Sequence, residues 1–416
     1  MESEPAAVHP GRGPRFEPFR ALRFAPDTDL GEVTAPPYDV LSTADVSALG
    51  ERSPHNIVHV DVPQAPAGMA GTDRYAAAAA RLSAWCDQGV LVRDERPSLT
   101  IYRLSFVDGT GRPRELVGVL GSLEVVDEGA GRVLPHERTT PKASTDRLEL
   151  TRATRTNLSP VWGLSLAGGL SAALTEPGEP VGRLRVDGVE HVIERVTDPE
   201  RLARISGIVG SDVVLIADGH HRYGVARHYR DELVAAGDPA GHNGATRTLA
   251  FVGELVADQL AIDPIHRMVR GIPSHRLRAA LARDFELVPA PGPTMAGGPG
   301  VVADLVRDER LLLVEDGREA CWLVPRPGAF AGVRALDGAW LEHTLAGSGA
   351  VMDYQHGLAE VLQVVEQDRD TAAILIRPTS LAEIERTARD GILMPPKSTF
   401  FTPKLRTGLV LRPLDD

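Results

Sequence analysis

The stretch VVLIADGHHR at residues 213–222 constrains the fold of this chain more than any other. An apolar, β-branched run ends at Asp218 and Gly219, and two histidines and an arginine follow before a helical pattern begins. Apolar residues then recur at three- and four-residue spacing from Tyr223 to Val234. The sequence therefore predicts a buried strand that turns sharply into a helix capped by Asp218 or Gly219.

The same turn is a candidate anion site. The first turn of a helix exposes free backbone N–H groups at the positive end of its dipole, and glycine lets a phosphate approach the backbone. Arg222 adds a planar fork of donors. Capping explains an aspartate here, but it does not explain Asp218, His220, His221 and Arg222 together. We expect phosphate or sulfate to bind at the helix N-terminus near His221.

Lysine is rare in this chain and occurs only in motif-like segments. Of the 45 Lys and Arg residues, three are lysines: Lys142, Lys397 and Lys404. A compact ammonium group can reach one phosphate oxygen as a point charge, whereas a guanidinium needs a wider site. We therefore interpret the three lysines as phosphate-neutralising groups, with Ser398 and Thr399 as further cofactor contacts in the segment MPPKSTFFTPKLRTG.

Length and composition are those of a globular protein. The 416 residues can form one large core or two to three ordinary ones, and 43% of them are hydrophobic and 25% charged. The N-terminus has no apolar core of a signal peptide, and no apolar run is long enough to span a membrane. The net charge of −12 argues against a nucleic-acid partner. We expect a cytoplasmic protein that binds a small molecule, with no membrane partner; the oligomeric state stays open.

The pattern of elements predicts an α+β fold with three parts. An N-terminal α/β region covers 1–130, a central domain with the histidine turn covers 131–288, and a C-terminal α+β domain covers 301–416 after a Pro/Gly-rich linker. Within them we expect a helix from Tyr75 to Trp85 and a helix over 149–159. Strand hairpins are expected over 98–126 and 181–196. Cys86 and Cys321 are too few and too far apart for a four-thiolate zinc site.

Several motifs in the same order resemble the bacterial DUF1015 family along nearly the whole chain. They include FRALRF, APPYDV, NIVHV, PHERT, ATRTNLSPVWGL, DGHHRY, DPIHRMV and MPPKSTFFTPKLRTGLV. The family carries no assigned activity, so this resemblance implies a shared fold and no chemistry.

The DGHHR core is also similar to the motif of the ParB, sulfiredoxin and free-serine-kinase superfamily. That similarity implies a ParB/sulfiredoxin-like core with a mixed sheet, and it implies phosphate binding by residues 218–222. Free-serine kinases need an upstream glutamate as base. Glu137 is the choice on chemical grounds, because His136 and Arg138 flank it and Thr139 and Lys142 follow.

Three functions remain open. The first is a phosphotransferase that uses ATP or ADP with Mg²⁺ to phosphorylate a small hydroxyl compound, with serine the leading candidate. Glu137 would be the base, Asp218 and Glu137 would help to place Mg²⁺, and His220 and His221 would lie among the catalytic groups. The second is a metal-dependent phosphatase or hydrolase that uses the same carboxylates with histidines as ligands. The third is a nucleotide or phosphometabolite sensor without catalysis.

Other polar residues allow either a structural or a functional interpretation. Tyr38 and Asp39 follow a rigid Pro-Pro turn, and His266 with Arg267 ends a predicted strand. Arg152 and Asn157 lie on the predicted helix before SPVWGL, where a solvated face is the commoner explanation. We further predict that segments 135–147, 218–222 and 394–404 converge on one pocket, because all three are rich in groups that bind anions.

Overall fold

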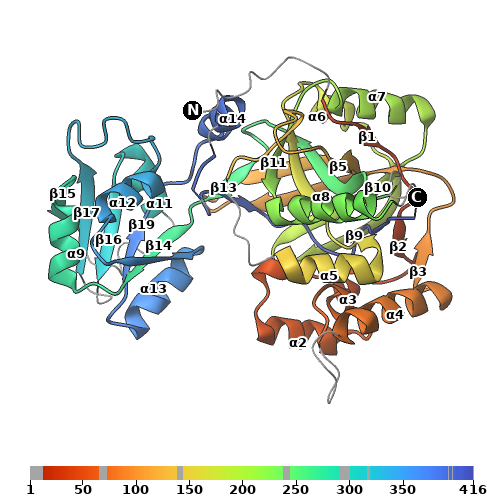
Figure 1. Ribbon diagram of the computed structural model, residues 1–416, viewed down its shortest axis with the longest axis horizontal. Helices are drawn as coiled ribbons and strands as arrows, with labels where there is room; N and C mark the ends of the chain where they lie inside the picture. Colours follow the sequence, from red (N-terminus) through yellow and green to blue (C-terminus); the bar gives the residue numbers. More distant parts are fainter. Residues whose placement is uncertain are drawn as a thin grey trace.

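The two largest β-sheets, each with its own helices, define two units of the chain (Figure 1). The computed structural model describes residues 13–64, 73–137, 144–237, 244–290, 300–315, 319–391, 393–395 and 397–415. The larger sheet forms one unit together with most of the helices, and the smaller sheet forms a second unit beside it (Figure 1).

The larger sheet is mixed and has the order β6-β11-β8-β12-β5-β4-β10-β9, with β1 paired to β5. The β11–β6 and β12–β8 pairs are parallel, and the other pairs are antiparallel. This confirms the predicted α+β class with a mixed sheet and the predicted strand hairpins. Its strands are β1 (Phe16–Glu17), β4 (Leu99–Val107), β5 (Pro113–Glu124), β6 (Val133–Leu134), β8 (Val161–Ser165), β9 (Glu179–Val186), β10 (Val189–Val196), β11 (Val214–Asp218) and β12 (Arg247–Glu254).

Strand β11 is buried on both faces, which explains its uninterrupted apolar run. Successive side chains of a strand point to opposite faces. Val214 and Ile216 belong to the hydrophobic cluster on one face of the sheet, and Leu215 and Ala217 belong to the cluster on the other. The strand therefore delivers Asp218 to the edge of a rigid, fully packed layer.

Helices surround this sheet, and the predicted helix at the histidine turn is present as α8. The helices are α1 (Leu30–Val33), α2 (Thr43–Arg52), α3 (Val58–Asp61), α4 (Asp73–Asp87), α5 (Ser144–Thr154), α6 (Leu170–Ala173), α7 (Pro199–Val209) and α8 (His220–Ala235), with a 3₁₀ turn at Tyr38–Val40. None of the helices in the described part of the chain is long and apolar enough to cross a membrane.

The helix predicted over 149–159 was placed too late in the chain. Helix α5 ends at Thr154, because Arg155 takes a left-handed backbone conformation with φ +46°. Asn157 then lies in the short strand β7 (Thr156–Asn157), which pairs with β21 (Arg412–Pro413) near the C-terminus. The hydrophobic spacing missed this boundary, since no glycine or proline marks it.

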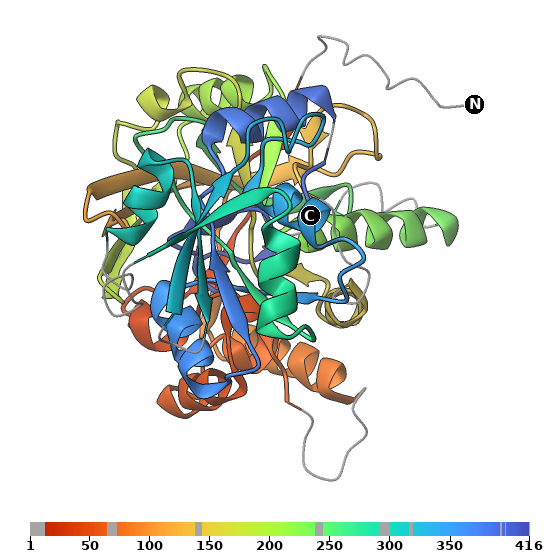
Figure 2. The same ribbon diagram turned by 90° about the vertical axis from the view of Figure 1, so that its left-hand side faces the viewer.

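The second unit is an antiparallel sheet of order β15-β17-β16-β19-β14-β18, seen in front of the larger unit in Figure 2. Helices α9 and α12 pack on one face, and α11 and α13 pack on the other. The predicted domain boundaries stay a prediction. The elements of this second unit are β14 (His266–Arg270), α9 (Ser274–Leu281), β15 (Phe285–Pro289), α11 (Val301–Arg307), β16 (Leu311–Glu315), β17 (Glu319–Pro325), α12 (Asp337–Leu345), β18 (Val351–Gln355), α13 (Leu358–Gln367) and β19 (Ala372–Leu375).

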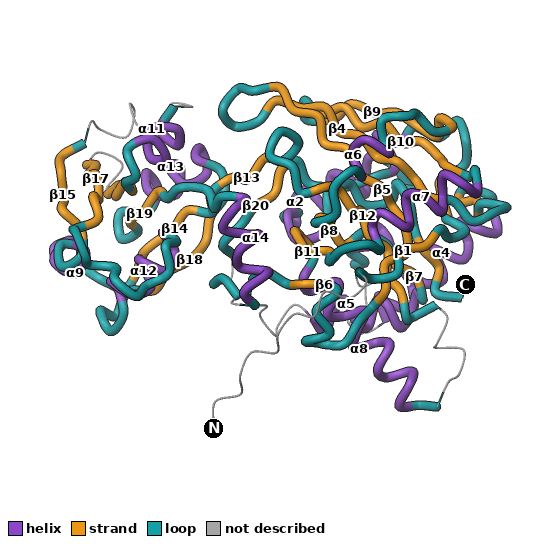
Figure 3. The backbone as a smooth tube through the Cα atoms, turned by 90° about the horizontal axis from the view of Figure 1, so that it is seen from above, coloured by secondary structure: helices purple, strands orange, loops and turns teal. Residues whose placement is uncertain are grey.

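The chain leaves the larger unit through β13 (Ala261–Asp263) and returns through β20 (Phe400–Thr402), and these two strands pair antiparallel. Helix α14 (Leu381–Asp390) lies on the return path, between the two units when seen from above (Figure 3). After α14, Met394 forms an isolated parallel bridge with Glu137. The described residues from Leu393 to Lys404, called the return segment below, thus lie against the segment that precedes α5.

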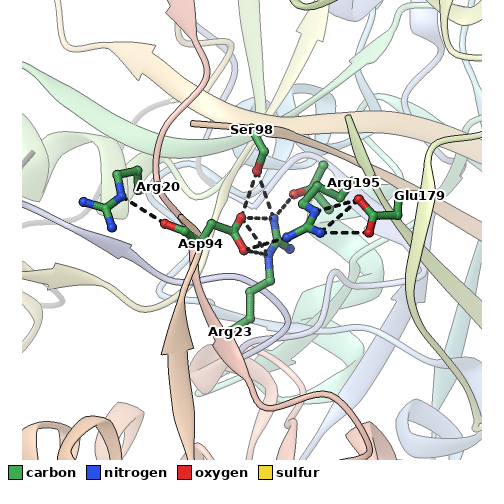
Figure 4. Close-up of polar contacts among 7 residues, drawn as sticks. Arg20, Arg23, Asp94, Ser98, Glu179 and Arg195 are labelled. Atoms are coloured by element: carbon green, nitrogen blue, oxygen red, sulfur yellow. Dashed lines mark hydrogen bonds and ion pairs between the residues drawn. The ribbon is translucent and has the colours of Figure 1, made fainter. Parts of the chain in front are cut away.

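A buried ion pair anchors the N-terminal segment to the larger sheet (Figure 4). Arg23, in β2 (Leu22–Phe24), donates from Nε to Asp94 at 3.1 Å and from Nη2 to Thr100 of β4 at 2.6 Å. Arg195 of β10 lies 3.5 Å from the same carboxylate, and Ser98 donates to it. Burial lowers the pKa of Arg23, while Asp94 opposes that shift. Strand β2 also pairs with β3 (Leu91–Arg93), so the ion pair and this strand pairing together attach the N-terminal segment.

Candidate functional site

A pocket of about 330 Å³ lies where β11, α8, the return segment and the second unit meet. Of the three segments predicted to converge, Glu137 from 135–147, the turn at 218–222 and four residues of 394–404 line this pocket together, whereas residues 144–147, in α5, do not line it. Lys142 lies outside the described residues. The pocket is lined by Tyr38, Asp39, Val40, Glu137, Ala217, Asp218, Gly219, His220, His221, Arg222, Ile265, Tyr354, His356, Lys397, Thr399, Phe400 and Lys404.

The turn from β11 into α8 depends on Gly219. Its φ of +86° is left-handed, and a Cβ there would lie 3.0 Å from Nε of Arg222. Glycine is therefore required both by the backbone and by the neighbouring side chain. Among the described residues, no protein acceptor takes the backbone N–H of His220 or Arg222. These N–H groups remain available at the positive end of a 16-residue helix.

Asp218 holds two cations at the pocket wall. Its Oδ1 accepts from Nζ of Lys404 at 2.7 Å, and its Oδ2 accepts from Nη2 of Arg222 at 2.5 Å. Burial alone would raise the pKa of Asp218, but Lys404 and Arg222 lower it well below its usual range. Nζ of Lys404 also lies 4.2 Å from the centre of the Phe400 ring. Both cations are thus held on the site by one carboxylate.

Glu137 lines the same pocket and accepts a hydrogen bond from the return segment. Its Oε2 accepts the backbone N–H of Ser398 at 3.3 Å, and its Oε1 lies 3.8 Å from Nδ1 of His220. The side chain is largely buried, and this burial raises the pKa of Glu137 from 4.5 to about 7. The neighbouring Lys397 and Lys404 only partly oppose the shift. A carboxyl group with such a pKa can accept or release a proton near neutral pH.

The hydrogen-bond network assigns the tautomers of the two buried histidines. Nδ1 of His136 lies 2.6 Å from the carbonyl oxygen of Ile216, which can only accept, so Nδ1 carries the proton. Burial lowers the pKa of His136 to about 4, so the ring is neutral and its Nε2 accepts from the Thr399 hydroxyl at 2.8 Å. Nε2 of His220 in turn accepts the backbone N–H of His136 at 3.4 Å.

His220 therefore presents its proton to Glu137. Burial lowers the pKa of His220 well below its usual value, so the ring is neutral. With Nε2 acting as an acceptor, the proton resides on Nδ1, which faces Oε1 of Glu137. At 3.8 Å this is a contact rather than a hydrogen bond, and it places a neutral donor beside the glutamate.

The second unit contributes residues that the sequence did not indicate. Tyr354 and His356 follow β14 by almost ninety positions, and both side chains are exposed at the pocket. The His356 ring stacks on Phe400, with 4.4 Å between ring centres and 15° between planes. No local pattern marks these residues, since β18 is a mostly exposed edge strand. Only the pairing of β18 with β14 brings them to the site.

Some predicted residues take other positions. The Ser398 hydroxyl donates to the carbonyl of Pro395 and does not line the pocket, so Ser398 contributes its backbone N–H alone. Arg152 pairs with two glutamates on the outer faces of α5 and α8, away from the pocket. Asn157 accepts the backbone N–H of Leu249, which is a structural contact.

The set of side chains is a poor match for a protein-held metal centre. In the part of the chain that the structure describes, no group of three or more His, Cys, Asp and Glu residues is arranged to hold a metal ion. Both oxygens of Asp218 already contact cations. Mg²⁺ commonly binds through one or two carboxylates together with substrate phosphates. A metal ion at this pocket would therefore need ligands from a bound molecule in addition to the protein side chains.

Known proteins resemble this chain only distantly in structure. None of the curated proteins matches the sequence. Free serine kinase in complex with AMP is 13% identical, with a TM-score of 0.36 over 67% of this chain and 88% of its own. C-terminally truncated SbnI from Staphylococcus aureus is 12% identical, with a TM-score of 0.39 over 71% and 87%. A conserved hypothetical protein from Pyrococcus furiosus is 12% identical, with a TM-score of 0.34 over 67% and 92%.

The sequence itself gives a clear assignment. The profile of DUF1015, described as a protein of unknown function, matches residues 16–339. That range contains Glu137, the whole turn from β11 into α8, and β14 of the second unit. It covers most of the chain, and so the protein belongs to the DUF1015 family.

Proposed function

We propose that this protein is a phosphotransferase that uses ATP or ADP, with Mg²⁺, to phosphorylate a small hydroxyl compound. The observation that carries the proposal is Glu137. Burial raises the pKa of this carboxyl group to about 7, and it faces a pocket that also holds cations and free helix N–H groups. A sensor does not need a base with a pKa near the working pH, whereas a kinase needs such a base to orient and deprotonate its acceptor.

The N-terminal turn of α8 suits the phosphates. The N-terminal turn of α8 offers backbone N–H groups, and Arg222 and Lys404 add two positive charges beside it. Lys397, exposed at the pocket, adds a third charge from the return segment. Phosphoryl transfer asks a protein mainly to position the reactants and neutralise charge, and these groups supply both.

In the proposed step, a phosphoryl group passes from the nucleotide to the acceptor hydroxyl. The acceptor hydroxyl oxygen forms a bond to the terminal phosphorus of the nucleotide, and its proton passes to the Glu137 carboxylate. The bond from that phosphorus to the bridging oxygen breaks, and its electron pair stays on the leaving nucleotide. Arg222, Lys404 and Lys397 neutralise the charge on the phosphate oxygens. Nδ1 of His220 lies 3.8 Å from Oε1 of Glu137, close enough to move to it as the acceptor binds.

Serine is the first acceptor to test, because the DGHHR turn resembles that of the free-serine kinases. Purified protein is incubated with Mg²⁺, ATP or ADP, and a panel of small hydroxyl compounds that includes serine. Phosphorylated products are followed by ³¹P NMR and mass spectrometry. The proposal expects a product that needs both nucleotide and acceptor.

Two results would replace the proposal. Measurable nucleotide binding without product from any acceptor would identify a sensor. Phosphate released from phosphorylated metabolites in the absence of nucleotide would identify a hydrolase, and loss of that release with a chelator would make it metal-dependent.

A further inference from the structure

Arg267 is a buried guanidinium that has no carboxylate partner among the described residues. It lies in β14, where the chain enters the second unit, and its residue is only 2% exposed. Its Nη1 donates to the carbonyl oxygen of Ile265, and its guanidinium carbon lies 4.8 Å from the centre of the Tyr354 ring. Among the described residues it makes no ion pair with a carboxylate. This contact set is small for a charge that cannot be released by deprotonation.

Two other buried arginines of this chain have a carboxylate partner. Arg23 and Arg147 each pair with a buried aspartate. Arg406 lacks a carboxylate but donates to both the hydroxyl and the carbonyl of Thr34. A buried charge without such compensation destabilises the folded state. Burial also lowers the pKa of Arg267. An anionic ligand at this position would supply the missing negative charge.

Gly338 leaves room for the guanidinium of Arg267. A Cβ on Gly338, in the first turn of α12, would lie 2.6 Å from Nη2 of Arg267, so any larger residue would displace it. The nearby Asp337 does not pair with Arg267, because Arg377 binds its carboxylate at 2.6 Å. The positive end of α12 and the positive side chain therefore lie together, which favours an anion between them.

The guanidinium adjoins the pocket. Both of its contacts, Ile265 and Tyr354, line the pocket, and Glu137 is near enough to act on its charge. Tyr354 pairs with Arg267 across β14 and β18, and its side chain is 41% exposed. Rotation of this exposed ring, which covers the guanidinium, would open Arg267 to the pocket.

We propose that Arg267 binds a carboxylate of the acceptor, with Tyr354 as its cover, so that the acceptor is a small hydroxy or amino-hydroxy acid. This inference rests on the proposed phosphotransferase function. The phosphates lie at the α8 end of the pocket, and Arg267 enters from the second unit, on the acceptor side. A guanidinium matches a carboxylate with two parallel hydrogen bonds, which a neutral amide cannot reproduce.

The test compares L-serine with serinamide, which lacks the carboxylate charge, in wild type and Arg267→Gln. Wild type should prefer serine, and Arg267→Gln should raise the KM for serine on the order of 30-fold, the effect of losing a buried charged partner. The KM for serinamide and the affinity for ADP should stay unchanged. Arg270→Gln, in the exposed half of the same strand, is the matched control and should leave all three values unchanged.

Stability separates this role from a structural one. Since the unpaired charge costs stability, Arg267→Gln should unfold at the same temperature as wild type or higher. A lower unfolding temperature with an unchanged KM for serine would overturn the inference. Weaker ADP binding with an unchanged KM for serine would also overturn it, by assigning Arg267 to the nucleotide.

A binding measurement keeps the inference apart from the proposed function. In the presence of ADP, L-serine and glycerate should stabilise wild type in thermal-shift titrations, and serinamide should not. This result without turnover would reject the phosphotransferase and retain the carboxylate site. Turnover with neutral acceptors as good as serine would reject the carboxylate site alone.

Discussion

Replacing Glu137 by glutamine should make the stability of the protein less sensitive to pH. Burial raises the pKa of this carboxyl group from 4.5 to about 7, so the folded state binds the proton more tightly than the unfolded state does. The stability that this proton contributes is fully present below about pH 4.5 and is lost as the pH rises through 7. Glutamine keeps the shape and cannot ionise, so the variant avoids this loss.

The size of the effect follows from the same values. Each tenfold change in an acid constant is worth about 1.4 kcal/mol. Between pH 5 and pH 8, the free energy of unfolding of Glu137→Gln relative to wild type should therefore rise by about 2 to 3 kcal/mol. Other titrating groups are common to both proteins and cancel in the difference.

Urea unfolding at pH 5, 6, 7 and 8 measures this difference. Tryptophan fluorescence is a suitable probe, because the buried Trp162 packs against Phe401 beside the site. Glu366→Gln, an exposed position on α13, is the matched control and should parallel wild type at every pH. A constant difference between Glu137→Gln and wild type across this range would refute the raised pKa and, with it, the poised base.

Three further substitutions test the phosphate side of the pocket. Gly219→Ala should cost about 1 to 2 kcal/mol for its left-handed backbone and should weaken ADP binding by displacing Arg222, whereas Gly188→Ala, also left-handed but with open space around it, should lose stability alone. Arg222→Ala should weaken ADP binding in calorimetry, and a fall in turnover with unchanged affinity would contradict the ground-state phosphate contact. Lys404→Met removes the nearest cation from Asp218 and should raise the pKa of that carboxyl group, so the midpoint of acid unfolding should move to higher pH; an unmoved midpoint would show that the pair is unimportant.

Local sequence patterns predicted the strand and helix that frame the site. The β-branched run before Asp218 and the spacing after Tyr223 carry the periods of a buried strand and a helix, and Gly219 marks the turn between them. The chemistry of Glu137 was chosen from residue type and resemblance. Its distance from His220 depends on the β11–β6 pairing and could not be predicted from spacing.

The residues that the second unit contributes to the pocket could not be predicted from local sequence patterns. Tyr354 reaches the pocket because β18 pairs with β14 and because the chain crosses between units through β13 and β20. Such pairings join residues far apart in sequence and leave no periodic signal. The end of α5 was missed for a related reason, since the left-handed residue there is Arg155 and not a glycine, and the strand that follows it pairs with the distant β21.

The most direct test of the account is the rate of phosphoryl transfer by Glu137→Gln compared with wild type, with ADP affinity measured on the same samples at pH 8. If Glu137 is the base, the variant should lose about 10² to 10⁴ in kcat. The Kd for the nucleotide should stay unchanged, because the proposed role of Glu137 is toward the acceptor rather than the phosphates. A variant that transfers phosphate at the wild-type rate, or that loses nucleotide affinity in proportion to its rate, would contradict the role of Glu137 as the base.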